Sequence, residues 1–125
     1  MELRTIEDGL RVKVATTEAE WQKGLAGVDG WAADYDGMLF EMPENRRWPI
    51  YALHLEQTLY IYWLSENEGV VAISSLEKES SVYHIPVLEA RYVLELFDPQ
   101  DWQIGDLVRV HEPTRPANEG VGTTQ

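Results

Sequence analysis

The most constraining feature of the sequence is a series of short apolar runs, each bounded by turn-forming or charged residues. After residue 37 the runs span 38–42, 48–53, 59–64, 70–75, 82–85, 92–96 and 107–110. Runs of four to six residues match the length of β-strands, and their spacing favours strands joined by short turns. Residues 11–14 alternate between charged and apolar with period two, as a half-buried strand does. The sequence therefore predicts a mainly β fold, a compact antiparallel barrel or sandwich.

One short helix is predicted near the N-terminus. Thr17 and Glu20 have the spacing of a capping box, in which each side chain accepts a hydrogen bond from a backbone N–H of the other residue. Glu18 adds negative charge where the helix dipole favours it. We expect the helix to span residues 17–23 and to end at Gly24, and we expect the glycine-rich stretch that follows to form a compact loop.

A tight hairpin is expected at Ser65–Gly69, where Asn67 and Gly69 can supply positive φ, so that residues 60–64 pair with 70–73. Beyond Val110 the sequence changes to proline, glycine and polar residues, with little apolar material to offset the entropy of ordering. We therefore predict one β-rich domain over residues 1–111 and a flexible C-terminal tail over residues 112–125.

Charge and the absence of cysteine exclude several functions. The 125 residues include 10 basic and 22 acidic side chains, a net charge of −12, so we expect no nucleic-acid partner. A chain without cysteine forms no disulfide, thiolate metal site or cysteine nucleophile. Charged residues at positions 2, 4, 7 and 8 are atypical of a signal peptide, and no run approaches the roughly 18 apolar residues of a membrane span. We therefore expect a cytoplasmic protein without a membrane partner.

Three short stretches, in order along one domain, resemble a known family. They are Gly24-Leu25-Ala26, Gly37-Met38-Leu39-Phe40, and Ala90-Arg91-Tyr92-Val93-Leu94-Glu95-Leu96 followed by Gly105-Asp106. Over about residues 12–110 the chain resembles the bacterial and archaeal domain of unknown function family 192, also called uncharacterised protein family 0127. The resemblance implies a compact, mostly β domain with a small helix. It implies no activity, because none is established for the family.

The central segment departs from the family pattern. Where members have an asparagine-threonine pair and then proline-leucine-aspartate, this chain has His54-Leu55 and, at the aspartate position, Tyr60. The resemblance therefore implies that any chemistry of those polar groups is lost or altered here. Many relatives also carry an export signal, which we do not expect in this chain.

His54 and Glu56 form the most suggestive ionisable pair. Two positions apart on a strand, they face the same side, and a salt bridge or hydrogen bond on a solvated strand face is the favoured interpretation. The alternative is a pocket in which Glu56 orients His54 as a catalytic base, with Arg47 or Tyr60 binding an oxyanion or phosphate. An enzyme is therefore left open but not favoured.

No cofactor or metal site is predicted. His54, His84 and His111 are about 30 residues apart, so no two have the local spacing of metal ligands. The stretch Asp34-Tyr35-Asp36-Gly37 is similar to the start of a calcium loop but lacks its later ligands, which favours an aspartate-capped turn.

The aromatic residues give the strongest signal. Within sixteen positions the chain has Trp48, Tyr51, Tyr60, Tyr62 and Trp63. Because residues 59–64 are apolar or amphipathic on both faces, this strand either crosses the middle of the fold or meets a partner, and core packing is favoured. The basic pair Arg46-Arg47 beside Trp48 either binds an anion or, as we favour, neutralises Glu41 and Glu44.

The predicted function is a non-enzymatic binding or assembly module. Its partner would be another protein or a second copy, contacted through Trp48, Tyr51, Tyr60 and Tyr62. One alternative is a small-molecule binder or small enzyme with a pocket around Arg47, His54, Glu56 and Tyr60. Another is an accessory component of a larger particle, kept soluble before assembly by its negative charge.

Overall fold

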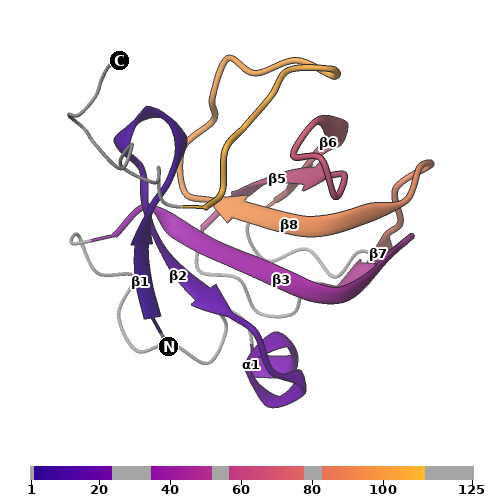
Figure 1. The fold of residues 1–125 in the computed structure, drawn as a ribbon, viewed down its shortest axis with the longest axis horizontal. Helices are drawn as coiled ribbons and strands as arrows, with labels where there is room; N and C mark the ends of the chain where they lie inside the picture. The colour runs from indigo at the N-terminus through magenta and orange to yellow at the C-terminus, as the bar shows by residue number, and fades with distance from the viewer. Residues whose placement is uncertain (1, 24–34, 52–56, 78–82, 112–125) are drawn as a thin grey trace, which may run out of the picture.

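The computed structural model of the chain describes residues 2–23, 35–51, 57–77 and 83–111 (Figure 1). The elements are β1 (Glu2–Thr5), the 3-10 turn η1 (Glu7–Gly9), β2 (Arg11–Ala15), α1 (Glu18–Lys23), β3 (Gly37–Arg46), β4 (Ile50–Tyr51), β5 (Leu59–Leu64), β6 (Val70–Leu76), β7 (Tyr83–His84) and β8 (Ala90–Leu96). The mainly β fold and the short N-terminal helix are confirmed. Strand β1 was not predicted, because its charged residues interrupt any apolar run.

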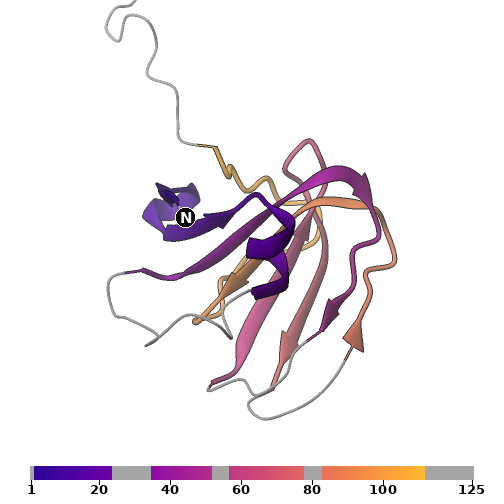
Figure 2. The same ribbon diagram turned by 90° about the horizontal axis from the view of Figure 1, so that it is seen from below.

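Six strands form one sheet in the order β1-β2-β3-β8-β5-β6, and β4 pairs with β7 in a small second sheet. Neighbouring strands of the large sheet are antiparallel except for β2 and β3, which are parallel. The connection of residues 16–36 is long enough for such a parallel crossover. Among the described strands the sheet is not closed, so β1 and β6 are its edges (Figures 1 and 2).

The capping box predicted at the start of α1 is present. The backbone N–H of Glu20 donates to Thr17 Oγ1 at 3.2 Å, and the Glu20 carboxylate accepts hydrogen bonds from the N–H groups of Thr17 and Thr16. The Trp21 indole N–H donates to Ala15 O at 3.1 Å, which fastens the helix to the end of β2. The predicted end at Gly24 and the loop after it lie outside the described residues.

The predicted hairpin joins β5 to β6, but its backbone differs from the expectation. Glu68, with a φ of 69°, occupies the left-handed region, which neither Asn67 nor Gly69 does. The Glu68 carboxylate accepts the backbone N–H of Val110 at 3.0 Å. This contact with a distant segment helps to hold Glu68 in a conformation that a local turn pattern would assign to asparagine or glycine.

Both faces of the large sheet are covered. The first core cluster includes Met38, Phe40, Ile61, Trp63 and Val93, and Trp21 and Trp48 pack against it. The second core cluster includes Val12, Leu39, Tyr62, Leu94, Trp102, Val108 and Val110. Tyr92, Val93 and Leu94 of β8 enter the two clusters in turn, as a central strand of a two-sided sheet requires.

Residues 107–110, predicted as a strand, form only an isolated bridge between Leu107 and Gly69. Val108 and Val110 are nevertheless buried in the second core cluster. The segment therefore covers the sheet face instead of extending the sheet. Its apolar residues indicated burial and not a strand. No helix in the described ranges is long and apolar enough to cross a membrane.

Candidate functional site

Three of the aromatic residues proposed from sequence, Trp48, Tyr60 and Tyr62, do not lie on one surface. Tyr62 is 2% exposed in the second core cluster, and its hydroxyl accepts the backbone N–H of Gln100 at 2.8 Å. Tyr60 is half-buried against the same cluster, whereas Trp48 packs against the first core cluster on the other face. Tyr62 is therefore a core residue in this structure and offers no contact surface to a partner.

Trp48 is held by its own segment. Its indole N–H donates to Glu44 O at 2.9 Å, and its backbone oxygen accepts the Trp63 indole N–H at 3.2 Å. The Arg46 guanidinium lies 4.1 Å from the centre of the Trp48 ring and 3.5 Å from the Glu44 carboxylate. Arg46 thus neutralises Glu44 as expected and lies over the Trp48 ring. Glu41, which was expected to pair with the same basic residues, pairs with Arg4 instead.

The alternative pocket stays a prediction, because His54 and Glu56 lie outside the described residues. Arg47 is exposed, and the backbone of Tyr51 pairs with Tyr83 in the small second sheet.

Asp36, from the stretch compared with a calcium loop, has a structural role. Its carboxylate accepts the Arg11 N–H at 2.8 Å, and its backbone oxygen accepts the Phe97 N–H at 3.1 Å. Asp36 therefore ties the start of β2 to the end of β8. Nowhere in the described part of the chain do three or more histidine or carboxylate side chains gather as metal ligands.

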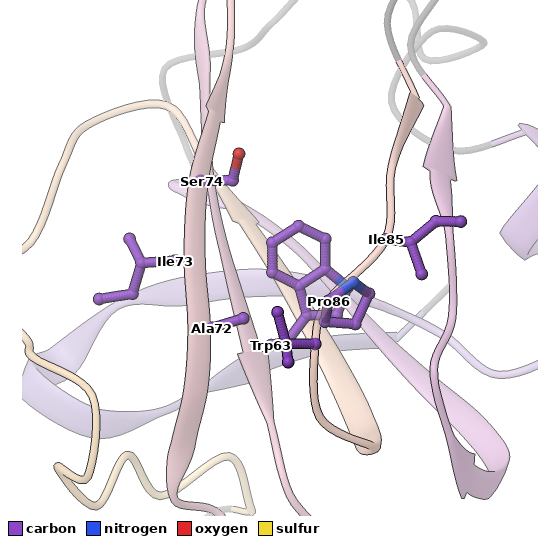
Figure 3. Close-up of a pocket in the computed structure, with 7 residues that line it drawn as sticks. Trp63, Ala72, Ile73, Ser74, Ile85 and Pro86 are labelled. Atoms are coloured by element: carbon purple, nitrogen blue, oxygen red, sulfur yellow. The ribbon is translucent and has the colours of Figure 1, made fainter.

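A groove lies on the first-cluster face, between β6 and the segment that follows β7 (Figure 3). We call it the β6 groove. Its volume is about 380 Å³, and it is lined by Trp63, Ala72, Ile73, Ser74, Ile85, Pro86 and Val87. The Trp63 indole lies between the two walls, with Ala72 and Ser74 on its β6 side and Pro86 on the other. The volume is in the range of known ligand clefts, roughly 300–1,000 Å³.

Aliphatic side chains around the β6 groove are unusually exposed. Ile73 is 43% exposed, Ile85 51% and Val87 81%, and the adjacent Leu88 is 54% exposed. Single exposed apolar residues are common, but several of them around one groove are typical of an interaction site.

The outer edge of β6 is paired at its start by the chain itself. The N–H of Val70 donates to Asp106 O at 2.9 Å, the N–H of Gly105 to Val70 O at 2.8 Å, and the N–H of Val108 to Glu68 O at 2.9 Å. Beyond Val70, no strand of the described ranges pairs with this side of β6. Residues 71–76 therefore continue an edge that already accepts backbone pairing.

A cluster of charged residues fixes this C-terminal segment. His111 Nδ1 lies 3.0 Å from the Glu68 carboxylate, and Arg4 Nη1 lies 2.7 Å from the Glu41 carboxylate and donates to Val110 O at 3.0 Å. These contacts connect β1, β3 and the β5–β6 hairpin to residues 110–111. They hold the segment that covers the start of β6.

Glu95 is the buried charged side chain of the described core, only 6% exposed. It lies on β8 between Met38 of β3 and Ile61 of β5, both fully buried. Desolvation raises the pKa of its carboxyl from 4.5 to about 7. An acid in this apolar row is a feature that core packing does not explain.

Comparison with known proteins identifies the family. Residues 2–110 match the family DUF192, described as an uncharacterized ACR. The chain belongs to DUF192. The resemblance drawn from the short sequence stretches is thereby confirmed. No curated protein matches the chain.

Two crystal structures share the DUF192 fold of this chain. A protein of unknown function from Novosphingobium aromaticivorans DSM 12444 has a TM-score of 0.68 and 17% identity, over 82% of this chain and 87% of that chain. A protein from Sinorhizobium meliloti 1021, described as "a putative transcription regulator", has a TM-score of 0.62 and 22% identity, over 70% of this chain and 68% of that chain. At these identities the likeness shows the fold alone.

Two of the stretches that carried the DUF192 resemblance are neighbouring strands. Gly37 at the start of β3 pairs with Leu96 at the end of β8, and Leu39 pairs with Leu94. A Cβ atom at Gly37 would collide with the backbone oxygen of Glu95 and lie 2.9 Å from Leu96 Cα. Glycine is therefore required for this close approach of the two strands, so the Gly37 stretch serves the sheet itself.

Sequence reasoning missed the β6 groove and Glu95. The apolar run of β6 was found, but its place at the edge depends on strand order, because β8 lies between β3 and β5. One signal for Glu95 was available, a single acid within the apolar run of residues 92–96. One signal for the groove was the uncharged sequence of β6.

Proposed function

We propose that this protein is a non-enzymatic binding module that takes a segment of another polypeptide in the β6 groove. The observation that carries the proposal is the contrast between the two edges of the sheet. Edge strand β1 has Glu2 and Arg4, and Arg4 pairs with Glu2 at 3.0 Å and with Glu41 at 2.7 Å. Edge strand β6, Val-Val-Ala-Ile-Ser-Ser-Leu, carries no charge.

Charged residues normally protect sheet edges against unwanted pairing. In a chain with a net charge of −12, an uncharged edge beside exposed aliphatic side chains is the one best suited to a partner. The proposal keeps the binding role expected from the sequence and moves the contact surface from Trp48, Tyr51, Tyr60 and Tyr62 to the β6 groove. The name of the Sinorhizobium protein does not alter this, because a charge of −12 opposes binding to a phosphate backbone.

The absence of cysteine from the sequence permits a direct test. A Val87→Cys variant is labelled with an environment-sensitive fluorophore and titrated with a library of short peptides and with a panel of cations, nucleotides, sugars and small acids. Leu3→Cys, on the opposite edge strand, is the control.

The proposal expects some peptides to change the fluorescence at position 87 and to leave position 3 unchanged. These peptides should also stabilise the unlabelled chain, by about 2.7 kcal/mol at about 100 times the dissociation constant. A response to small ligands together with silence toward peptides would contradict it and would favour the pocket around Arg47, His54, Glu56 and Tyr60. A response to neither would favour the accessory component of a larger particle.

A further inference from the structure

Building on the proposed function, we propose that the occupant of the β6 groove is an extended segment that adds to β6 as a further strand. Its side chains would alternate between apolar residues that enter the groove and residues that include lysine or arginine. Three observations carry this inference: the pairing at the start of β6, the alternation of β6 side chains, and the charge of the chain.

The pairing at the start of β6 shows that its outer edge accepts backbone hydrogen bonds. Residues 105–108 supply them at Glu68 and Val70. The chain then turns away at 103–106, where the Asp106 N–H donates to Gln103 O at 2.9 Å and Gly105 has a φ of 98°. A partner strand would start where residue 105 leaves the edge and would run along residues 71–76.

The side chains of β6 define what the added strand would meet. Ala72 and Ser74 point toward the Trp63 indole, whereas Ile73 points to the opposite side of the strand (Figure 3). Because side chains alternate along a strand, every second residue of the partner would enter the groove between Trp63 and Pro86. These positions require apolar residues. The remaining positions would flank Ile73 and face solvent.

The charge of the chain decides between partners. A second copy also has a net charge of −12, and the repulsion between the two chains would oppose their association. A segment with lysine or arginine at its solvent-facing positions is attracted instead, and its approach is faster at low salt. The electrostatics therefore favour a basic segment over self-association.

The first experiment identifies the occupant. A display library of random peptides is selected on the immobilised full chain, with parallel selection on Ile73→Lys. We expect enrichment, on the wild type alone, of sequences that alternate apolar residues with basic ones over about the six residues 71–76 of β6. The most enriched peptide is then synthesised for calorimetric titration at low and at near-physiological salt.

The second experiment tests the mode of binding. Ile73→Lys and Val87→Lys should each weaken peptide binding by roughly tenfold or more. Each places a positive charge against a basic ligand, Val87→Lys at the groove and Ile73→Lys beside the solvent-facing basic positions of the added strand. Leu3→Lys is the matched control, since Leu3 is 42% exposed on the other edge strand and Ile73 is 43% exposed. N-methylation of alternate peptide amides should abolish binding in one register and leave it in the other, because only one set faces β6.

The outcomes separate the two proposals. If Ile73 and Val87 matter but N-methylation in either register has no effect, the groove binds peptides and strand addition is wrong. If sedimentation shows a dimer that Ile73→Lys dissociates, the occupant is a second copy and the basic segment is wrong. If the substitutions at Ile73 and Val87 weaken the binding of no peptide, both the strand addition and the proposed function are wrong.

Discussion

Replacing Glu95 with glutamine should raise the stability of this protein most at alkaline pH. Below pH 4.5 the carboxyl is protonated in both the folded and the unfolded chain, so glutamine and glutamic acid behave alike. As the pH rises from 4.5 to about 7, the unfolded chain releases this proton while the folded chain keeps it. The free energy of unfolding of the wild type therefore falls over this range relative to the variant, and above it the difference is constant.

The magnitude follows from the shift. A pKa raised from 4.5 to about 7 corresponds to about 3 kcal/mol, at about 1.36 kcal/mol per pKa unit. Solvent screening removes little of this, because Glu95 is 6% exposed and lies between Met38 and Ile61. Below pH 4.5 the two chains should differ only by the packing of an amide against a protonated acid.

The assay is urea unfolding of both chains, followed by tryptophan fluorescence, at a series of pH values. Subtracting the two curves cancels the other carboxylates. Glu20→Gln is an opposite control, because the Thr16 N–H and then the Thr17 N–H lower the pKa of Glu20. Glu20 stabilises the fold above its unfolded pKa and loses this effect as the pH falls, so its replacement should be harmful at neutral pH and harmless in acid.

A difference between wild type and Glu95→Gln that stays flat from acid to alkaline pH would refute the reasoning. It would mean that the carboxyl is solvated or paired in the folded chain. If Glu20→Gln instead became more stable than the wild type as the pH rises, as Glu95→Gln should, the pH series would report net charge and not the two sites.

Three further substitutions, one of them with a matched control, test the fold. Gly37→Ala should destabilise the chain by about 3 kcal/mol in chemical denaturation, since the new Cβ meets the backbone of β8; a loss under about 1 kcal/mol would show that β3 moves aside easily. Thr17→Ala should lower the free energy of unfolding by about 1 kcal/mol and speed amide hydrogen exchange in α1. Unchanged exchange would show that the capping box does not stabilise the helix. Tyr62→Phe should cost about 1 kcal/mol by removing the acceptor of the Gln100 N–H, whereas Tyr60→Phe should cost less than about 0.5 kcal/mol; equal effects would contradict the assigned contact.

Local signals in the sequence predicted local structure well. The capping box of Thr17 and Glu20 and the hairpin between β5 and β6 depend on residues a few positions apart, and both are present. The position of positive φ in the hairpin was wrong because Glu68 is held by Val110, 42 residues away. The parallel pairing of β2 with β3 likewise depends on a partner across a long connection.

The candidate site could not be read from the sequence for a related reason. Aromatic residues drew attention to the run of residues 59–64, yet this strand lies between β8 and β6 and buries both faces. The edge strand β6 is marked instead by the absence of charge, which an apolar run also shows when it is central. What distinguishes the two cases is strand order, which is set by contacts between residues far apart in the chain. A binding edge of this kind can be identified only when the order β3-β8-β5-β6 is known. In that order β5 has a strand on each side. Beyond Val70, β6 has a described strand on one side only.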